Sequence, residues 1–280
     1  MLVRMSPPAT HFFRRRDLLA IGWTDRELAR AVAEGRLLKP RDNAYLPPDV
    51  PADVVDACGF GGRLTCLSEL RRLGVFVLDQ GDLHVHLHQN RATMPRLTRR
   101  VRRHWERLRR TPPVCSTSVE VLDAVVQAIR CQQPRAALAT LDSALHLGVL
   151  HADDVAEVFS ALPKRHRLLW SLIDARAESG PETLVRLMLR ALGASFEVQV
   201  RIVGVGRVDF VVDGWLIVEC DSEEFHSTWQ DQRRDRRRDQ AAAALGYATY
   251  RPIAEDIMWR PDEVQTALAG LLRGRSARAR

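Results

Sequence analysis

Two acidic residues, Asp209 and Glu219, are the side chains of this sequence best suited to chemistry by their type and spacing. Asp209 lies in the apolar run VDFVV and Glu219 ends the apolar run LIVE, on either side of a turn. Acids are rare within such strands, because a buried carboxylate loses its hydration unless a cation or a hydrogen-bond donor replaces it. A divalent cation meets that need, and phosphodiester hydrolysis uses such an ion to activate water. The pair therefore predicts a site for Mg²⁺ or Mn²⁺ with both acids as ligands.

The length of the loop between the two strands decides whether these acids can share one ion. The strands are joined by DGW, in which Asp-Gly is a strong signal for a tight turn. A two-residue turn would place Asp209 opposite Val218 and leave Glu219 on the other face, because side chains alternate along a strand. A three-residue loop, the whole of DGW, would place Asp209 opposite Glu219. The metal site therefore requires the longer loop or a β-bulge.

Two further polar residues follow Glu219 along the chain. Asp221 lies two positions later, so in a continuing strand it points to the same side. His226 comes shortly after, and imidazole titrates near neutral pH, which suits a general base. Both residues are predicted to be catalytic.

Acids in the flanking helices have a structural as well as a catalytic interpretation. Glu182 ends the sequence SGPE, so it either supports the metal site or completes a capping box with the serine. Asp235 and Asp239 lie one helical turn apart, and they either support the site or pair with Arg238 and neighbouring arginines on a solvated face. The arginines of this helix are predicted to hold a nucleic-acid strand: Arg233, Arg234, Arg237 and Arg238.

The last hundred residues are predicted to alternate between helices and strands in a defined order. Apolar periodicity favours helices where it repeats every three to four residues and strands where it alternates. Asp-Gly between two apolar runs predicts a hairpin. Gly246 is predicted to end the helix that follows this hairpin. The expected elements are a helix over 179–193, a strand over 196–202, a hairpin over 206–222, a helix over 231–246, a strand over 247–253 and a helix around 264–272. This αβββαβ order is that of the restriction-endonuclease-like PD-(D/E)XK fold.

The segment resembles a family of small nucleases related to the very-short-patch-repair (Vsr) endonucleases. The resemblance spans about 85 residues, and it is carried by Glu182, Gln199, Val208-Asp209-Phe210, Val218-Glu219-Cys220-Asp221, His226, Asp235, Arg238-Asp239, Gly246-Tyr247 and Arg251. It implies Asp209 as principal metal ligand with Glu219 and Asp221 nearby. It also implies Glu182 as a supporting acid, His226 as the base and Gln199 as a supporting residue.

Two positions depart from the family pattern. Ser222 stands where the family commonly has glycine after the acidic pair, so the loop conformation is expected to differ. Asp221 stands where the broader fold has a catalytic lysine, and the sequence near it has none. The Vsr-like enzymes also lack that lysine and use histidine, which makes His226 the residue on which activity depends.

The first fifty residues predict a winged helix-turn-helix. A helix over 14–22 is followed by a second helix that starts with the capping box of Thr24 and Glu27 and ends at Gly35. Two short strands then surround Asp-Asn, a pair that tolerates hairpin geometry. In such a domain the second helix enters the major groove of DNA and the hairpin touches the backbone. The predicted contacts are Arg26, Arg30, Arg36 and Arg41; the alternative is a small helical packing module without DNA contact.

Residues 23–47 resemble the N-terminal winged-helix domain of the AbiE-type antitoxins of toxin–antitoxin systems. Gly35, Leu37 and Tyr45 match the ending typical of these domains. Asn43 stands where glycine is usual, but asparagine also reaches positive φ, so the turn is expected to persist. The resemblance implies DNA as a partner and a possible cognate toxin or other protein partner.

The middle segment contains no recognisable catalytic motif. LHVHLHQ, residues 83–89, alternates as a strand with His84, His86 and His88 on one face, which is either a metal site or a polar surface. No cysteine or carboxylate stands beside these histidines in the sequence. The arginine-rich run 99–110 either follows phosphates or forms a solvated face, and apolar periodicity predicts three helices within 119–161.

The composition sets the general class of protein. We expect an α+β multidomain chain with a winged helix in 1–50, a mixed α/β middle in 51–170, and in 171–280 a Vsr-like nuclease whose basic tail, 274–280, is disordered.

The net charge of +7 suits a polyanion, and 40 of the 42 basic residues are arginine, whose fork matches phosphate. Five scattered cysteines favour reduced thiols over disulfides or a zinc site. No apolar run reaches membrane-spanning length and no signal peptide is evident, so a cytoplasmic protein with no membrane partner is expected.

These observations lead to alternative functions. The first is a metal-dependent DNA endonuclease or nickase that is targeted by its winged helix. The second is a non-catalytic, antitoxin-like transcriptional regulator that binds DNA and carries a degenerate nuclease domain. The third is a protein-interaction scaffold that uses the helical middle segment.

Overall fold

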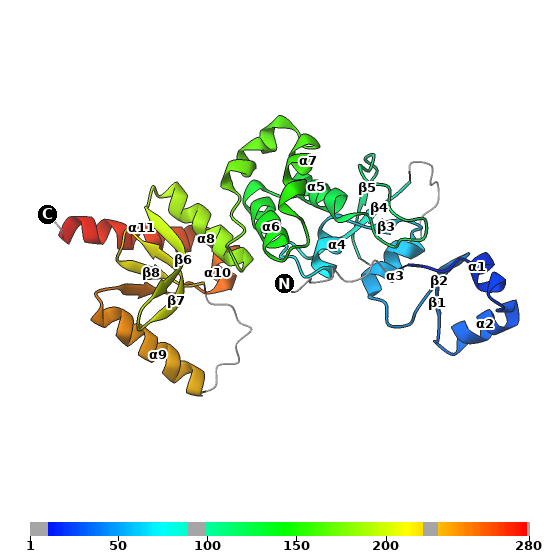
Figure 1. The fold of residues 1–280 in the computed structure, drawn as a ribbon, viewed down its shortest axis with the longest axis horizontal. Coiled ribbons are helices and arrows are strands. Elements are labelled where there is room, and N and C mark those ends of the chain that lie inside the picture. The colour runs from blue at the N-terminus through cyan, green and yellow to red at the C-terminus, as the bar shows by residue number, and fades with distance from the viewer. Residues whose placement is uncertain (1–10, 89–98, 221–228, 279–280) are drawn as a thin grey trace. The chain divides into compact units, whose positions relative to one another are not determined.

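The computed structural model describes residues 11–88, 99–220 and 229–278. The chain divides into two compact units, Met1–Leu172 and Ile173–Arg280 (Figure 1). The fold is α+β, with helices and three small sheets in the described residues. The predicted boundary at residue 50 lies inside the first unit, and the one near residue 170 lies beside the division between the units.

The first unit begins with two helices and a hairpin, in the order predicted. These elements are α1 (Arg15–Ala20), α2 (Asp25–Ala33), β1 (Leu38–Arg41) and β2 (Ala44–Leu46). Both hydrogen bonds of the Thr24–Glu27 capping box are present, which explains why α2 begins at this point. Arg41 pairs with Ala44 across the hairpin, and Asn43 adopts the left-handed φ of 61° that its turn requires.

The rest of the first unit combines a three-stranded sheet with helices. Its elements are α3 (Ala52–Gly59), β3 (Arg63–Leu64), α4 (Cys66–Arg72), β4 (Leu83–His86), β5 (Val101–His104), α5 (Val121–Cys131), α6 (Pro134–His146), η1 (Ala152–Asp154), α7 (Val155–Ser160) and η2 (Lys164–Leu172). The three helices predicted within 119–161 are confirmed as α5, α6 and α7. The predicted strand over 83–89 is shorter, because β4 ends at His86. In the sheet, β4 pairs antiparallel with β3 and parallel with β5.

The second unit consists of a four-stranded sheet with helices before, between and after its strands. The elements are α8 (Gly180–Ala191), β6 (Phe196–Ile202), β7 (Gly206–Val212), β8 (Leu216–Val218), α9 (Trp229–Ala244), β9 (Ala248–Tyr250), α10 (Ala254–Trp259) and α11 (Pro261–Arg278). The strand order is β6-β7-β8-β9; the first two pairings are antiparallel and the last is parallel. The predicted order αβββαβ is therefore present in α8 to β9.

Helix α9 packs on one face of this sheet through a small apolar core. Val208 and Ile217 of the strands meet Ala242 of the helix there, together with Val205 and Val211. Figure 1 shows α9 and α8 on opposite sides of the sheet. The helix between β8 and β9 therefore serves as the crossover that a parallel strand pair needs.

The C-terminus differs from what the sequence predicted. The tail 274–280 was expected to be disordered, but α11 continues as a helix to Arg278. The residues before α11 form a separate short helix, α10. The sequence WRP separates the two helices, because its proline lies at the first position of α11, where proline is tolerated. No helix in the described part of the chain is both long and apolar enough to cross a membrane.

The register of the β7–β8 hairpin answers the question of loop length. Val212 pairs with Leu216 and Phe210 pairs with Val218, so residues 213–215 form a three-residue loop. Continuing this register by one residue brings Asp209 opposite Glu219. The longer loop that the acidic pair requires is therefore confirmed.

Gly62 provides a test of the packing in the first unit. A Cβ atom at Gly62 would lie 2.4 Å from Val85 Cγ1 and 2.6 Å from the His86 carbonyl oxygen, so strand β4 would have to move. We expect Gly62→Ala to lower the free energy of unfolding of this unit by about 1–3 kcal/mol, measured by chemical denaturation. Gly81→Ala is the matched control, because its Cβ would have its nearest contact at an ordinary 3.5 Å. Equal stability of the two variants would contradict the packing described.

Candidate functional site

The central feature of the second unit is a cluster of two acids and an amide, here called the acid–amide cluster. It consists of Glu182 from α8, Gln199 from β6 and Asp209 from β7. Gln199 Nε2 donates to Glu182 Oε2 at 2.8 Å and, at a long 3.5 Å, to Asp209 Oδ1. The amide must present its N–H groups to the carboxylates, since its oxygen would be repelled by them. One glutamine thus links acids from a helix and a strand.

Gln199 has an unusual backbone for a residue within a strand. The β6–β7 register is regular on both sides, with Val198 paired to Phe210 and Val200 to Val208, which places Gln199 opposite Asp209. Yet Gln199 has a left-handed φ of 53°. This conformation costs on the order of 1–3 kcal/mol in a non-glycine residue and is retained where surrounding contacts enforce it, often at functional sites. Its Oε1 atom is buried and has no hydrogen-bond partner among the described residues.

The two acids of the cluster are held where ionisation is unfavourable. Burial raises the pKa of Asp209, while a hydrogen bond to Oδ2 from the Cys220 backbone N–H, at 2.8 Å, acts in the opposite direction. Burial also raises the pKa of Glu182, and the negative charge of Asp209 raises it further. Two like charges in a poorly hydrated place repel, so a cation or a shared proton would stabilise them.

Glu182 fulfils only half of the capping box that its sequence predicts. The Ser179 hydroxyl accepts a hydrogen bond from the Glu182 backbone N–H at 3.3 Å, as expected for the N-cap residue of α8. The Glu182 carboxylate, however, accepts from the Glu178 backbone N–H at 3.0 Å and from Gln199. The side chain therefore belongs to the acid–amide cluster as well as to the start of the helix.

Glu219 lies opposite Asp209 but has cationic partners of its own. Its carboxylate accepts from Arg238 of α9 at 2.6 Å and forms an ion pair with Arg251, which follows β9. Burial raises the pKa of Glu219, and the two arginines oppose that shift. Glu219 thus forms ion pairs with two arginines, whereas among the described residues no arginine forms an ion pair with Asp209, although the charge of Arg207 lowers its pKa. As a metal ligand, Glu219 would have to exchange these arginines for the ion.

The supporting acids of α9 also contact these arginines. Asp239 Oδ1 accepts from Arg251 at 2.9 Å, and Asp235 lies 4.0 Å from Arg238. Asp235 thus lies near Arg238, as the structural interpretation expected, whereas Asp239 pairs with Arg251 beyond β9. Asp239, Arg251 and Glu219 form one continuous charged group at the edge of the α9 core.

Two predicted catalytic residues cannot be placed relative to the acid–amide cluster. Asp221 and His226 lie outside the described residues, as does Ser222. Their roles stay predictions from the sequence.

The arginines predicted to contact DNA divide into exposed and internally bound ones. Arg26 is exposed, and Arg30 and Arg36 are exposed while sharing Glu34. Such surface ion pairs contribute little stability and exchange readily for other anions. In α9, Arg233, Arg234 and Arg237 are exposed. Arg238 instead donates to Glu219 and to the carbonyl oxygens of Val205 and Arg207, so its contacts are internal.

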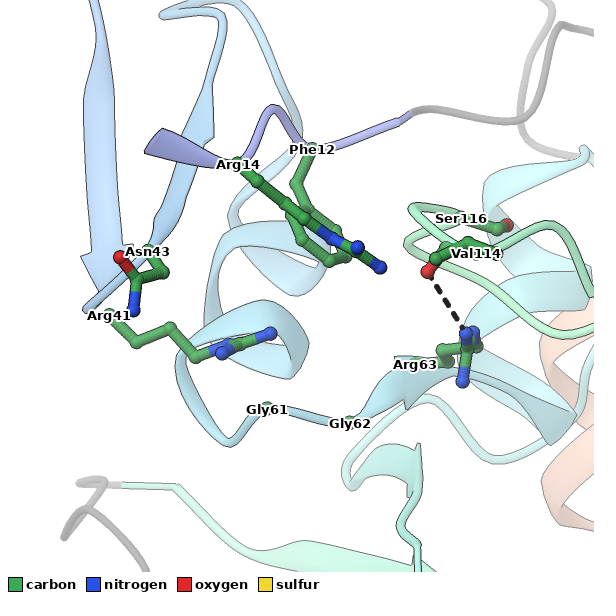
Figure 2. A pocket seen from close by; sticks show the side chains of 9 residues that line it. All are labelled: Phe12, Arg14, Arg41, Asn43, Gly61, Gly62, Arg63, Val114 and Ser116. Atoms are coloured by element: carbon green, nitrogen blue, oxygen red, sulfur yellow. Dashed lines mark hydrogen bonds between the residues drawn. The ribbon is translucent and has the colours of Figure 1, made fainter. Parts of the chain in front are cut away.

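Arg41 contributes to a basic pocket in the first unit that is shown in Figure 2. The pocket has a volume of about 260 Å³, and the side chains of Arg14, Arg41 and Arg63 enter it from the segment before α1, the hairpin and β3. No acid is among the described residues that line it. The remaining lining residues are Phe12, Asn43, Gly61, Gly62, Val114 and Ser116.

Neutral groups hold these arginines in place. Arg41 Nε donates to the Cys58 carbonyl oxygen at 3.0 Å, and its guanidinium lies 5.4 Å from the centre of the Phe12 ring. Arg63 donates to the Val114 carbonyl oxygen, and its Nε is buried without a hydrogen-bond partner among the described residues. Burial lowers the pKa of Arg63. Three cations with no acid between them favour an anion such as phosphate.

Some of these residues could not be found from the sequence. Arg14 and Arg63 are 49 positions apart and carry no motif, so only the fold brings them to Arg41. Trp229, at the start of α9, is 63% exposed, and the Arg236 guanidinium lies 5.8 Å from the centre of its ring. An exposed tryptophan among arginines offers a stacking surface for a base.

Comparisons with protein families, curated proteins and solved structures gave no match for this chain. The resemblances to the Vsr-like nucleases and to the AbiE-type antitoxins therefore stay predictions. Function is inferred below from the contacts of the acid–amide cluster and of the arginines.

The raised pKa of Asp209 predicts a stabilising substitution. Such a carboxyl group has a higher pKa in the folded protein than in the unfolded chain. Its contribution to the free energy of unfolding is complete at a pH below the unfolded pKa, and it is lost as pH rises through the folded pKa. Asp209→Asn removes this loss, so in metal-free buffer at pH 7 we expect its melting temperature to exceed that of the wild type by a few degrees. The difference should shrink towards pH 3, where the wild-type acid is protonated.

Glu197→Gln is the matched control for this measurement. Glu197 is an exposed acid of the same sheet, so its neutralisation should change the melting temperature little at any pH. Thermal unfolding followed by circular dichroism across this pH range gives both values. A less stable Asp209→Asn protein at pH 7 would show that the carboxylate is well compensated in the fold, contrary to the geometry described.

Proposed function

We propose that this chain is a metal-dependent DNA endonuclease or nickase whose catalytic residues lie in the second unit. The observation that carries the proposal is the Gln199 amide held between the buried Glu182 and the half-buried Asp209, whose pKa values partial or full burial raises. Perturbed acids that converge on a strained residue are typical of functional sites. The order of α8 to β9 and the mixed pairing of the sheet support a restriction-endonuclease-like core.

The donor atoms of the acid–amide cluster suit a hard divalent cation. Carboxylate oxygens of Asp209 and Glu182 and an amide oxygen are the ligand types that Mg²⁺ or Mn²⁺ prefers. Because the N–H groups of Gln199 face the two acids, its amide would have to rotate to offer the unpartnered Oε1 to the same ion. When bound, such an ion would lower the pKa of a water molecule and neutralise charge on the phosphate. Glu219 would join these ligands after leaving Arg238 and Arg251. The sequence assigns the general base to His226 and a further acid to Asp221.

DNA contacts are proposed for both units. Arg233, Arg234 and Arg237 on α9 would hold phosphates of the cleaved strand, with Trp229 as a stacking surface. In residues 1–50, α1, α2 and the β1–β2 hairpin support a winged helix, in which Arg26, Arg30 and Arg36 would contact DNA. The pocket of Arg14, Arg41 and Arg63 would take a backbone phosphate.

One observation favours a second candidate, a DNA-binding regulator of the antitoxin type with a degenerate nuclease domain. Glu219 is paired with two arginines, as expected of an acid kept for stability and no longer for metal binding. A cognate toxin would be its protein partner. Both candidates bind DNA, so only cleavage separates them.

Cleavage of supercoiled plasmid with Mg²⁺ or Mn²⁺ tests the nuclease proposal. We expect the purified chain to nick the plasmid, and Asp209→Asn and Glu182→Gln to reduce the rate about 100-fold or more, since each removes a charged ligand of the ion. Glu197→Gln, an exposed acid of the same sheet, should keep the wild-type rate. If the wild type and Asp209→Asn cut at the same rate, the activity is a contaminant and the proposal fails. DNA binding without any cleavage would support the regulator.

Salt dependence of DNA binding tests the arginine pocket. Each phosphate contact contributes about 0.9 to the slope of log K against log salt concentration. Arg63→Ala should therefore reduce the slope by about 1 and weaken binding to all sequences alike. Arg167→Ala replaces an exposed arginine of η2 that does not line the pocket, and it should leave the slope unchanged. An unchanged slope for Arg63→Ala would exclude a phosphate in this pocket.

A further inference from the structure

Two cysteines and two histidines of the first unit converge on one point. One ligand atom from each of Cys66, His84, His104 and Cys131 lies within 4.8 Å of the other three. The residues come from four elements: the start of α4, strand β4, strand β5 and the end of α5. We call them the Cys₂His₂ cluster. None of them belongs to the acid–amide cluster or to the arginine pocket.

The spacing within the cluster is close to that around a tetrahedral ion. Zinc ligands at about 2.0–2.3 Å from the ion lie about 3.3–3.8 Å from each other in a tetrahedron. His84 Nδ1 is 3.1 Å from His104 Nε2, and Cys131 Sγ is 4.0 Å from the same His104 atom. These two distances bracket the tetrahedral values, so small side-chain movements would complete the geometry.

The cluster is buried, which makes its polar atoms expensive without a partner. Cys66 is fully buried, and His84 and His104 are each 4% exposed. Leu83 and Val85, on either side of His84, belong to an apolar core. His84 therefore lies inside the protein, whereas His86 is half-buried and His88 is exposed, so the predicted histidine face is buried only at its start. Buried imidazoles and thiols need hydrogen bonds or a metal to replace water.

Local contacts orient the ligand residues. Cys66 has a left-handed φ of 52°, an uncommon conformation for a non-glycine residue. The preceding residue, Thr65, donates from its hydroxyl to Gln127 Oε1 at 2.6 Å, which fixes the chain there. His104 Nδ1 lies 3.7 Å from Glu106 Oε2, so the carboxylate faces the ring nitrogen that is directed away from the cluster.

The two thiols already differ in acidity. Hydrogen bonding with Cys66 lowers the pKa of Cys131, whereas burial raises the pKa of Cys66. A thiolate at one cysteine and a thiol at the other share one proton between their two sulfurs. A divalent metal would displace that proton and bind both sulfurs. Binding should therefore weaken as pH falls, because protons compete for the thiolates.

We propose that Cys66, His84, His104 and Cys131 bind one Zn²⁺ ion in a structural site. Two thiolates and two imidazoles are ligands that zinc prefers and that Mg²⁺ does not. Four protein ligands leave no open position for substrate, which distinguishes this site from a catalytic one. The ion would join α4, β4, β5 and α5, and it would stabilise the first unit independently of any nuclease activity.

Metal analysis of the full-length chain tests the site. After purification under reducing conditions, we expect inductively coupled plasma mass spectrometry to find about one zinc ion per chain. Cys66→Ser and Cys131→Ser should each lower the zinc content by more than about tenfold. Cys115→Ser, which alters a half-buried cysteine of the same unit outside the cluster, should keep it. Asp209→Asn should keep it too, so failure of the nuclease proposal would leave this result intact.

Cobalt substitution gives a readout that does not depend on whether the variants fold. Chelated wild-type protein refilled with Co²⁺ should show thiolate charge-transfer absorption and the visible bands of tetrahedral cobalt. The same chelation should lower the melting temperature of the wild type. Absence of zinc together with absence of these bands would overturn the proposal, as would a Cys66–Cys131 disulfide in the freshly purified, metal-free chain.

Discussion

The half-buried carboxylate of Asp209, held within a sheet, is the constraint on which the second unit depends. A carboxylate between Val208 and Phe210 has neighbours that offer it no hydration, so its environment has to be supplied by other elements. The Cys220 backbone donates to it, and β6 adopts a left-handed residue so that the Gln199 amide lies opposite. That amide in turn holds Glu182 and thereby positions the start of α8. Strand, loop and helix are thus arranged around one carboxylate that has hydrogen bonds but no ion pair among the described residues.

The sequence allowed much of this arrangement to be predicted. The period of apolar residues gave the order of α8 to β9, and the capping box of Thr24 gave the start of α2, because both are local properties of the chain. The choice between a two- and a three-residue hairpin loop was left open, since it depends on how the strands pair. The arginine partners of Glu219 were missed for the same reason. They come from α9 and from the end of β9, and no spacing rule connects them to β8.

Long-range convergence also explains why the Cys₂His₂ cluster escaped sequence analysis. Its four residues are separated by 18, 20 and 27 positions, so they lack the close pairs by which zinc sites are recognised. Parallel pairing of β4 with β5 is what brings His84 to His104. The alternation of LHVHLHQ predicted histidines on one face, but only the structure shows that His84 is buried beside cysteines while His88 is exposed.

The acids of the second unit differ chiefly in which cation balances them. Arginine remains charged at any physiological pH and is tied to the chain, so Arg238 and Arg251 stabilise Glu219 permanently. In the proposed nuclease, a divalent ion would balance the charges of Asp209 and Glu182 only while it is bound. The ion pairs that the arginines make with Glu219 would then compete with metal binding there. The two proposed functions, nuclease and regulator, would differ by an exchange of cations at this one carboxylate.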